Sequence, residues 1–493
     1  MAYKLNDRCQ MNLFPATIND YVSANDPVRV YDAFVGKLNF DELGIPLELI
    51  KAGAREYYPK DMLKLIIYGT SYGIRTSRKL ERACYHNVSF MWLMSNLKPD
   101  YRTIARFRQR HREAIKKVLK QCVKVCIELG LIEGNTLFTD GSFFRANASI
   151  KNTWTEERCK KQLKKVFKRI DRLVDESIDT DNAQEEQKSL VKIDKELTNK
   201  TELEKKMQKI ISKLKEEQKN SINTTDPECV KVKSRQGTHA GYNAQITVDE
   251  KHGLIVNSES TDHNQDANQL SRQVKEASRV LNKKPRTVVA DSGYHSLEDL
   301  DQVDKGIDVI VPSQKQAQEE NSHPLSPFDK DKFIYNPQKD EYICPEGKSL
   351  KYQTSARTRL KPRHWMEHFK KNSPSRYKVY RADSEDCRTC RHFKTCTTSP
   401  SGRQISRFKQ EDLKHKLEAA YKSPEGQKIY KLRKEKVELP FGHMKRNLQA
   451  GQFLLRGKAG TNAELAILST CFNIARMITL IGVSTLILRF KGT

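Results

Sequence analysis

The sequence predicts an α/β protein in which helical segments precede, interrupt and follow a mixed sheet. Three observations predict this class. Apolar residues have helical spacing through about residue 135, short strand-like runs then occur at 136–140, 242–258, 287–291 and 307–311, and the chain after about residue 416 is helical again. Strands and helices in this mixed order are typical of an α/β core.

The composition indicates a polyanionic partner. The chain has 493 residues, with 89 Lys and Arg against 62 Asp and Glu, so its formal net charge is +27. This length predicts about three domains. Because a protein this basic repels itself unless it meets a polyanion, the phosphate backbone of nucleic acid is the expected partner, rather than an acidic protein or a small anion.

The sequence predicts no membrane partner. The first residues lack the apolar core of a signal peptide. The one long apolar stretch, from Leu465 to Leu488, is interrupted by Asn473 and Arg476, so a packed terminal helix is expected there. Eleven cysteines without a secretory signal predict a reducing compartment. We therefore expect a cytoplasmic, nucleoid-associated protein.

Residues 1–135 predict a helical DNA-binding domain. Pro59 starts one apolar helix, a second runs from about Ser77 to His86, and a third follows Pro99 and Asp100. The third helix is strongly basic, and three short helices of this kind are typical of helix-turn-helix domains. The expected DNA contacts are Arg102, Arg106 and Arg108. A small helical bundle with a solvated basic face is the alternative.

Residues 136–153 and 221–315 form the predicted catalytic core, and residues 154–220 interrupt it as an insertion. The insertion is rich in Lys and Glu, with apolar residues at helical spacing on both sides of a polar stretch at 179–182. This pattern predicts an antiparallel helical hairpin. Within the core, alternating residues on both sides of a turn at 249–253 predict a β-hairpin.

Three carboxylates stand in settings that suit divalent metal ions. Asp140 and Asp291 each end a predicted strand and precede small residues, and Glu438 lies alone among Lys and Arg residues. Mg²⁺ prefers oxygen ligands, and two such ions about 3.5–4 Å apart can serve phosphoryl transfer on DNA. Each acid also has a structural alternative, which is a turn or helix cap for either Asp and a surface ion pair for the Glu.

Short motifs surround these acids and the sheet between them. They are FTDGS at 138–142, GYNAQ at 241–245, VADSGY at 289–294 and VELPFG at 437–442, preceded by PDYRTIARFR at 99–108. In this order they resemble bacterial insertion-sequence transposases with a DDE active site, and among these the IS eleven-eighty-two group. The resemblance spans nearly the whole chain.

The resemblance implies a ribonuclease H-like core in which Asp140, Asp291 and Glu438 bind two Mg²⁺ or Mn²⁺ ions. A related signature of Tyr, Arg, Glu and Lys on the Glu-bearing helix corresponds to Tyr430, Arg433, Glu438 and Lys445. By the resemblance, the Tyr, Arg and Lys of this signature contact DNA. The implied partners are the double-stranded terminal inverted repeats of the element and target DNA, bound by a homodimer.

Residues 316–415 form a predicted Cys-rich insertion that is polar and irregular, and residues 416–493 return to the core as the helical part carrying Glu438. Four cysteines predict a structural Zn²⁺ site: Cys344, Cys387, Cys390 and Cys396. A Cys-x-x-Cys pair fits two positions of tetrahedral zinc, and four protein ligands leave no open position for chemistry. Unliganded thiols, a Cys₃His set and a redox pair are the alternatives.

Basic and aromatic residues are interleaved between Cys344 and Cys387. Such a composition can bind a DNA backbone and stack an unpaired base. The run comprises Arg357, Arg359, Lys361, Arg363, Trp365, Phe369, Lys370, Lys371, Arg376, Tyr377 and Tyr380. A loose, solvated loop is the alternative for this segment.

Together these features predict a DNA transposase that binds the ends of its own element, cuts DNA with metal ions and transfers the freed strand to target DNA. Both steps are in-line displacements at phosphorus, so one metal pair can serve both. Two alternatives stay open. One is a ribonuclease H-like nuclease without strand transfer, and the other is a non-catalytic zinc-containing DNA-binding protein.

Overall fold

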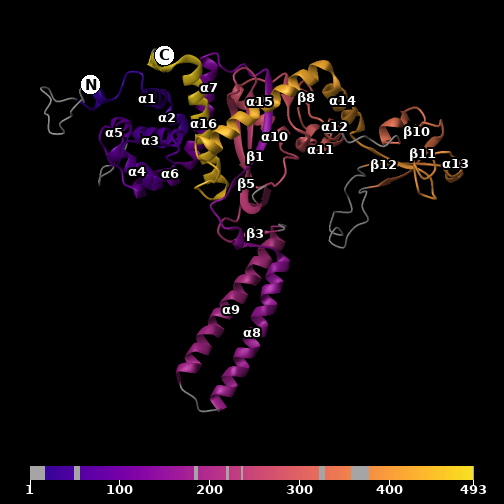
Figure 1. Ribbon diagram of the computed structural model, residues 1–493, viewed down its shortest axis with the longest axis horizontal. Helices are drawn as coiled ribbons and strands as arrows, with labels where there is room; N and C mark the ends of the chain where they lie inside the picture. Colours follow the sequence, from indigo (N-terminus) through magenta and orange to yellow (C-terminus); the bar gives the residue numbers. More distant parts are fainter. Residues whose placement is uncertain are drawn as a thin grey trace, which may run out of the picture. The chain divides into compact units, whose positions relative to one another are not determined.

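The computed structural model describes residues 17–48, 56–182, 187–217, 221–234, 237–320, 328–356 and 377–491. The chain divides into two compact units. The first is drawn from residues 1–266, 273–285 and 433–493, and the second from residues 267–272 and 286–432. Figure 1 labels the helices and strands of both.

The N-terminal part of the first unit is helical, as predicted. After a 3-10 turn at Ile18–Tyr21 come α1 (Val28–Lys37), α2 (Phe40–Leu43), α3 (Pro59–Ser71), α4 (Ser77–His86), α5 (Val88–Leu93), α6 (Tyr101–Arg110) and α7 (Arg112–Glu128). The side chain of Thr76 caps α4 by accepting from the Lys79 amide, and Asp100 caps α6 by accepting from the Thr103 amide. Caps of this kind contribute about 1 kcal/mol each, which explains why the predicted starts of these two helices are right.

The strands of the first unit are antiparallel. The central strand β5 (Gly237–Asp249) pairs with β1 (Thr136–Arg145), β4 (Val230–Ser234) and β6 (Ile255–Thr261). The predicted β-hairpin is confirmed as β5 and β6. A separate short ladder joins β2 (Thr153–Trp154) to β3 (Ile222–Asn223), next to a 3-10 turn at Ile150–Asn152.

The first strand is longer than predicted. The sequence places its end at Asp140, but β1 continues to Arg145 because β5 offers backbone partners from Asp249, opposite Leu137, to Gly241, opposite Arg145. Asp140 therefore lies inside a strand, opposite Ile246, and the prediction that it ends the strand is wrong.

Two long helices, α8 (Glu156–Asn182) and α9 (Gln187–Glu216), run side by side as a helical hairpin, as Figure 1 shows. The predicted hairpin of helices is therefore present, although α8 continues through the expected turn at 179–182. Near the β2–β3 ladder the two helices share a small core of buried side chains: Cys159, Met207, Ile210, Leu214 and Ile222. Farther along, Arg169 donates two hydrogen bonds of 3.0 Å to the Glu196 carboxylate across the pair.

The remaining helices of the first unit are at the C-terminal end of the chain. They are the latter part of α15 (Pro424–Arg446), α16 (Gly457–Ile481) and α17 (Val483–Lys491). By length and composition α16 could cross a membrane, but 61% of its most apolar window is buried in the protein, as expected of a core helix. It packs against α3, α7 and β6. The N-terminal helices and the antiparallel strands β1, β4, β5 and β6 thus belong to one compact unit.

The second unit contains a pair of parallel strands, β7 (Thr287–Val289) and β8 (Asp308–Ile310). Its short helical elements are the 3-10 turns Ser292–Tyr294 and Lys330–Lys332, α11 (Leu297–Leu300), α12 (Gln314–Glu320), α13 (Ser384–Arg388) and α14 (Glu411–Lys422); α10 (Leu270–Leu281) joins the two units in sequence. Antiparallel strands in one unit and parallel strands in the other, among helices, confirm the mixed α/β class.

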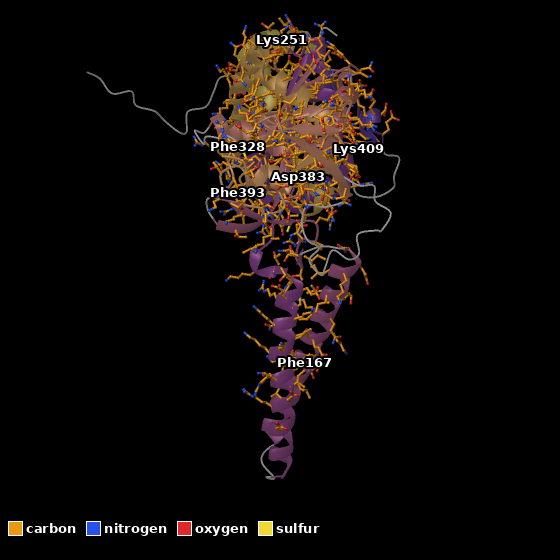
Figure 2. All side chains as sticks on the ribbon, turned by 90° about the vertical axis from the view of Figure 1, so that its right-hand side faces the viewer. Phe167, Lys251, Phe328, Asp383, Phe393 and Lys409 are labelled. Carbon is orange, nitrogen blue, oxygen red and sulfur yellow. The ribbon has the colours of Figure 1, made fainter. Side chains whose placement is uncertain are left out.

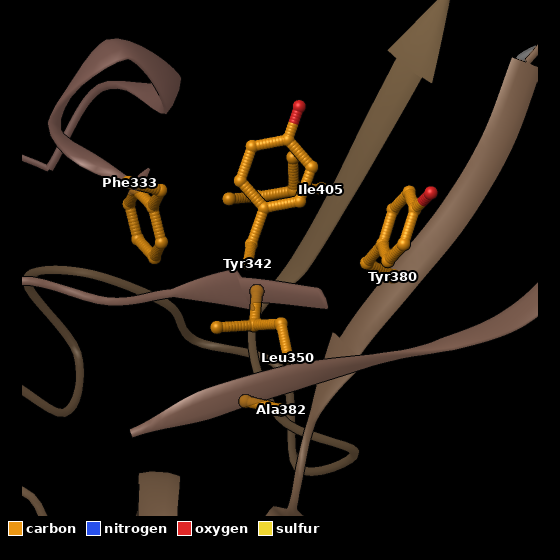
Figure 3. Close-up of a cluster of buried hydrophobic side chains, with 6 residues drawn as sticks. All are labelled: Phe333, Tyr342, Leu350, Tyr380, Ala382 and Ile405. Atoms are coloured by element: carbon orange, nitrogen blue, oxygen red, sulfur yellow. The ribbon is translucent and has the colours of Figure 1, made fainter. Parts of the chain in front are cut away.

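A second sheet occupies the segment that the sequence predicts to be irregular. Its five antiparallel strands are β9 (Ile334–Asn336), β10 (Glu341–Ile343), β11 (Ser349–Ala356), β12 (Tyr377–Ala382) and β13 (Gln404–Phe408). Figure 3 shows its buried cluster of Phe333, Tyr342, Leu350, Tyr380, Ala382 and Ile405. The prediction of irregular structure is therefore wrong. These strands are short and polar, so they show little hydrophobic alternation in the sequence, and one small buried cluster holds them together.

Candidate active site and DNA-binding surfaces

Asp140 lies on the face of β1 that α15 covers. Its Oδ1 atom accepts a hydrogen bond from the Gly141 amide at 2.9 Å and lies 3.4 Å from Nη1 of Arg433. The Asp140 and Arg433 side chains are only 17% and 13% exposed, so salt screens this ion pair less than it would a surface pair. Arg433 thereby fixes the Asp140 carboxylate from the side of α15.

Lys445 reaches the same face of β1 from the other end of the helix. Its Nζ atom donates to Ser142 Oγ at 2.5 Å and lies 4.9 Å from the centre of the Phe144 ring, within cation–π range. Burial lowers the pKa of Lys445 below its usual value, and the negative charge of Asp140 partly offsets this effect. Ser142 stands in a motif of the sequence but is not among the predicted site residues.

Aromatic packing fixes α15 on β1. The Phe144 ring stacks on Phe453 at 5.1 Å between centroids and lies 6.3 Å from Phe441 of α15. Val437 and Met444, on the same side of α15, are fully buried. Because this core sets the position of the helix along the strand, it also sets where the charged residues of α15 stand.

Glu438 lies on α15 between the two residues that reach β1, Arg433 and Lys445, and its side chain is exposed. Two helical turns separate Glu438 from Lys445, so both lie on one side of the helix. The structure thus brings Asp140, Arg433 and Lys445 together and places Glu438 on the helix that joins the last two.

Asp291 and Tyr430 belong to the second unit. Asp291 is expected to end a strand, but β7 ends at Val289 and Asp291 comes two residues later. There its side chain accepts a hydrogen bond from the Gly293 amide at 2.8 Å and caps the 3-10 turn. A turn or helix cap is the alternative to a metal-binding role that the sequence leaves open for Asp291, and the structure shows such a cap. Tyr430 packs edge-to-face on Tyr421, with 5.0 Å between ring centroids.

The predicted acids suit Mg²⁺ or Mn²⁺ in kind, because carboxylate oxygens are the ligands that hard cations prefer. In arrangement, no group of three or more His, Cys, Asp or Glu side chains among the described residues could hold a metal ion. Asp140, Asp291 and Glu438 therefore stay predicted ligands, and the pair of divalent ions stays a prediction with them.

The helices α4 and α6 carry a basic surface. Arg78 and Arg82 of α4 are exposed, as are Arg102 and Arg106 of α6. The guanidinium groups of Arg78 and Arg102 lie 5.1 and 5.8 Å from the centre of the Tyr101 ring, so cation–π contacts hold both beside one aromatic residue. Arg78 and Arg82 are not among the predicted DNA contacts, although their spacing of four residues on a predicted helix is a signal that the sequence offers.

The Arg108 side chain makes a contact within the protein, and this placement does not support the expected contact with DNA. Its Nη1 atom donates to the Arg75 carbonyl oxygen at 2.7 Å. Burial lowers the pKa of Arg108 to about 10, against the opposing effect of the Glu464 charge. The position explains this placement, because Arg108 follows the fully buried Ile104 by four residues and lies on the same inner side of α6.

The four cysteines of the predicted zinc site line one small cavity of about 40 Å³. Backbone amides donate to three of the sulfur atoms: Lys348 to Cys344 at 3.2 Å, Arg403 to Cys387 at 3.3 Å and His392 to Cys390 at 3.5 Å. Cys344, Cys387 and Cys396 also pack against the cluster in Figure 3. The arrangement is not that of a formed metal site among the described residues, so zinc is not supported by it.

The interleaved basic and aromatic run lies largely outside the described residues, which omit 357–376. Its last two aromatic residues are in β12. Tyr380 is fully buried in the cluster of Figure 3, where its hydroxyl donates to Asp340 at 2.6 Å, so the expectation that Tyr380 stacks on a base is wrong.

Two family models match the chain. Residues 343–478 match a model described as a transposase DDE domain, and this segment contains the four clustered cysteines, Glu438 and Lys445. Residues 16–110 match a model described as a transposase domain (DUF772), and this segment contains Arg102, Arg106 and Arg108. Comparisons with curated proteins and with solved structures found no match. The chain therefore carries a transposase DDE domain and a DUF772 transposase domain.

Proposed function

We propose that the protein is a DNA transposase of the IS eleven-eighty-two group, which binds the terminal inverted repeats of its own element and catalyses strand cleavage and strand transfer. The observation that carries the proposal is the contact between α15 and β1. Two cations of α15, Arg433 and Lys445, stand beside Asp140 and Ser142, and Glu438 lies on the helix between them. A carboxylate held beside two cations suits a reaction on a phosphate backbone.

Asp140, Asp291 and Glu438 would hold two Mg²⁺ or Mn²⁺ ions in a ribonuclease H-like core. Bound there, such ions activate the attacking oxygen and stabilise the leaving oxygen. The chain's own residues orient the reactants: Arg433 fixes the Asp140 carboxylate, while Lys445, held by Ser142, supplies a positive charge that attracts the phosphate. We place Tyr430 against the DNA as well, and we expect a homodimer on DNA because two element ends must meet.

A cleavage assay tests this function. The protein would be incubated with a duplex that carries the end of its element, in Mg²⁺ or in EDTA, and the strands would be followed on denaturing gels. We expect Mg²⁺-dependent nicks at the element end. Nicks that are never followed by joining would favour a nuclease, and tight binding without any cutting would leave a DNA-binding protein.

The exposed Arg residues of α4 and α6 are the proposed entry point for duplex DNA. We expect the double change Arg102→Ala and Arg106→Ala to weaken duplex binding and to lower the slope of log affinity against log salt by about 2, because each lost phosphate contact removes about 0.9. Fluorescence anisotropy at several salt concentrations measures this slope.

The matched control removes two exposed cations of α7, Lys116 and Lys120, which lie outside the proposed surface. The control should leave the slope nearly unchanged. If both double variants change the slope equally, the basic surface of α4 and α6 has no special role and general charge accounts for the binding.

We further propose that Cys344, Cys387, Cys390 and Cys396 bind one structural Zn²⁺. In support, all four thiols line one cavity, and three of the sulfur atoms accept backbone amide hydrogen bonds of the kind that stabilise a thiolate. A metal here would fasten α13 and the β10–β11 turn to the second sheet, whose buried cluster has six residues.

Elemental analysis tests this site. We expect about one zinc per chain in purified protein, and loss of that zinc in Cys387→Ser, because a structural site needs its fourth thiolate. The control is Cys229→Ala, which changes a cysteine of the first unit and should keep the zinc. Wild-type protein without zinc, or Cys387→Ser with a full complement, would contradict the proposal.

A further inference from the structure

We propose that a basic stripe on α8, made of Arg158, Lys161, Lys165, Lys168 and Arg172, binds the phosphate backbone of duplex DNA. All five side chains are exposed. The inference rests on the proposed function, which supplies the duplex, and it adds a binding surface beyond α4, α6 and α15. It assigns a purpose to the helical hairpin, which the proposed chemistry leaves unused.

Helical geometry gathers the five residues on one side of α8. At about 100° per residue, their positions fall within an arc of about 80°, and Arg158 and Arg172 are about 21 Å apart along the axis. The buried side chains Cys159, Val166 and Leu173 face another side of the helix. The stripe therefore points away from the packing surface between α8 and α9.

The stripe carries charge of a single sign. Between positions 158 and 172 the sequence has eight Lys and Arg residues and one acid, Asp171. Two of these cations lie outside the stripe and form ion pairs: Lys160 with Glu156 at 2.7 Å and Arg169 with Glu196 at 3.0 Å.

The stripe residues themselves keep their charge available. Lys161, Lys165, Lys168 and Arg172 make no ion pair with any residue in the described ranges. Arg158 is fixed at the base of the hairpin, where its guanidinium lies 4.3 Å from the centre of the Trp154 ring and donates to the Thr153 carbonyl oxygen at 2.6 Å. Among the described residues the other four cations have no acidic partner, so an external anion can pair with them.

Duplex DNA fits this length and charge. It carries about one negative charge per 1.7 Å of axis, so about 21 Å of stripe faces roughly six base pairs. A second copy of the hairpin fits less well, although the half-exposed Phe167, which Figure 2 labels on α8, offers some apolar surface. Two copies of one basic stripe would repel each other.

The test neutralises the stripe in the full chain. The variant carries Lys161→Gln, Lys165→Gln, Lys168→Gln and Arg172→Gln, because Gln keeps helix propensity while removing charge. The matched control removes four exposed cations from α7: Lys116→Gln, Lys117→Gln, Lys120→Gln and Lys124→Gln. Binding to a 30-base-pair duplex is measured by anisotropy in EDTA, so that cutting plays no part, and circular dichroism verifies the helix content.

We expect the stripe variant to lose about tenfold or more in affinity at 0.1 M salt and to lower the salt slope by about 3 to 4, whereas the control stays close to wild type. A second variant that keeps the charge, with Lys161→Arg, Lys165→Arg and Lys168→Arg, should bind duplex as wild type does. Equal effects of variant and control would overturn the inference while the proposed function stands.

Two other outcomes would also count against the inference. If the stripe variant keeps its duplex affinity but changes the oligomeric state in mass photometry, the hairpin joins copies of the chain and the stripe is no DNA site. Wild-type protein that fails to bind any duplex would overturn the proposed function first, and this inference with it.

Discussion

Replacing Asp140 with Asn is expected to abolish DNA cleavage while duplex binding is retained or slightly tightened. The change removes a carboxylate charge from beside Arg433 and Lys445, and with it a proposed metal ligand, at nearly constant volume. We expect the cleavage rate to fall at least about a thousandfold, which corresponds to about 4 kcal/mol of transition-state stabilisation. Binding should not suffer, because one negative charge near the phosphate has gone.

The same loss is expected for Glu438→Gln, and here α15 offers a matched control. Glu435 lies on the same helix, its side chain is 73% exposed, and among the described residues its ion pair is with its neighbour Lys436. Glu435→Gln should cut DNA at the wild-type rate. If Glu435→Gln and Glu438→Gln have equal effects, or if Asp140→Asn still cuts, the assignment of the catalytic acids is wrong. Thermal unfolding of each variant separates loss of chemistry from loss of fold.

Replacing Glu464 with Ala is expected to lower the free energy of unfolding by about 3 to 5 kcal/mol. Its carboxylate pairs with Arg75 and accepts the amide hydrogen bonds of Leu454 and Leu455 at 2.8 and 3.1 Å. The Arg75 and Glu464 side chains are only 8% and 11% exposed, so removing one partner leaves a nearly buried charge unpaired.

The position of this ion pair links the loss of stability to the site. Arg75 also donates to the carbonyl oxygens of Gln449 and Gln452, in the segment that follows α15. The ion pair therefore helps to fix the end of the helix that carries Glu438 and Lys445. Chemical denaturation measures the loss.

The control for this prediction is Glu128→Ala, which breaks a pair with Lys37 in which the Glu side chain is 57% exposed. Exposed pairs contribute about 0 to 1 kcal/mol, so the control should unfold close to wild type. Equal losses in Glu464→Ala and Glu128→Ala would show that the buried pair gives no special support to the fold.

Local signals in the sequence predicted much of the fold. Asp100 before the basic helix and the alternation on both sides of residues 249–253 are short-range features, and they correctly predict α6 and the β5–β6 hairpin. The full length of β1 depends on β5, which lies about 100 residues away in sequence, so no local pattern showed that Asp140 is inside a strand. The second sheet was missed because strands as short as β9 and β10 have too few residues to show a period.

The sequence predicts part of the candidate site, because local motifs are visible in it and long-range contacts are not. Asp140, Arg433 and Lys445 were chosen from motifs, and the structure brings their side chains together. Arg108 shared the basic composition of its helix with Arg102 and Arg106, and composition does not reveal which side of a helix faces inward. The pairing of Arg75 with Glu464 joins residues 389 positions apart, a distance over which no sequence pattern acts.

Strand joining tests the central claim most directly. A labelled element end, already cut to expose its 3′-OH, would be incubated with wild-type protein, Mg²⁺ and a plasmid target, with Asp291→Ala alongside. A transposase with the proposed acids predicts labelled ends covalently joined to the plasmid by the wild type, and none by Asp291→Ala. Wild-type protein that binds the cut end and nicks DNA yet joins nothing, or Asp291→Ala that joins as well as wild type, would contradict the account.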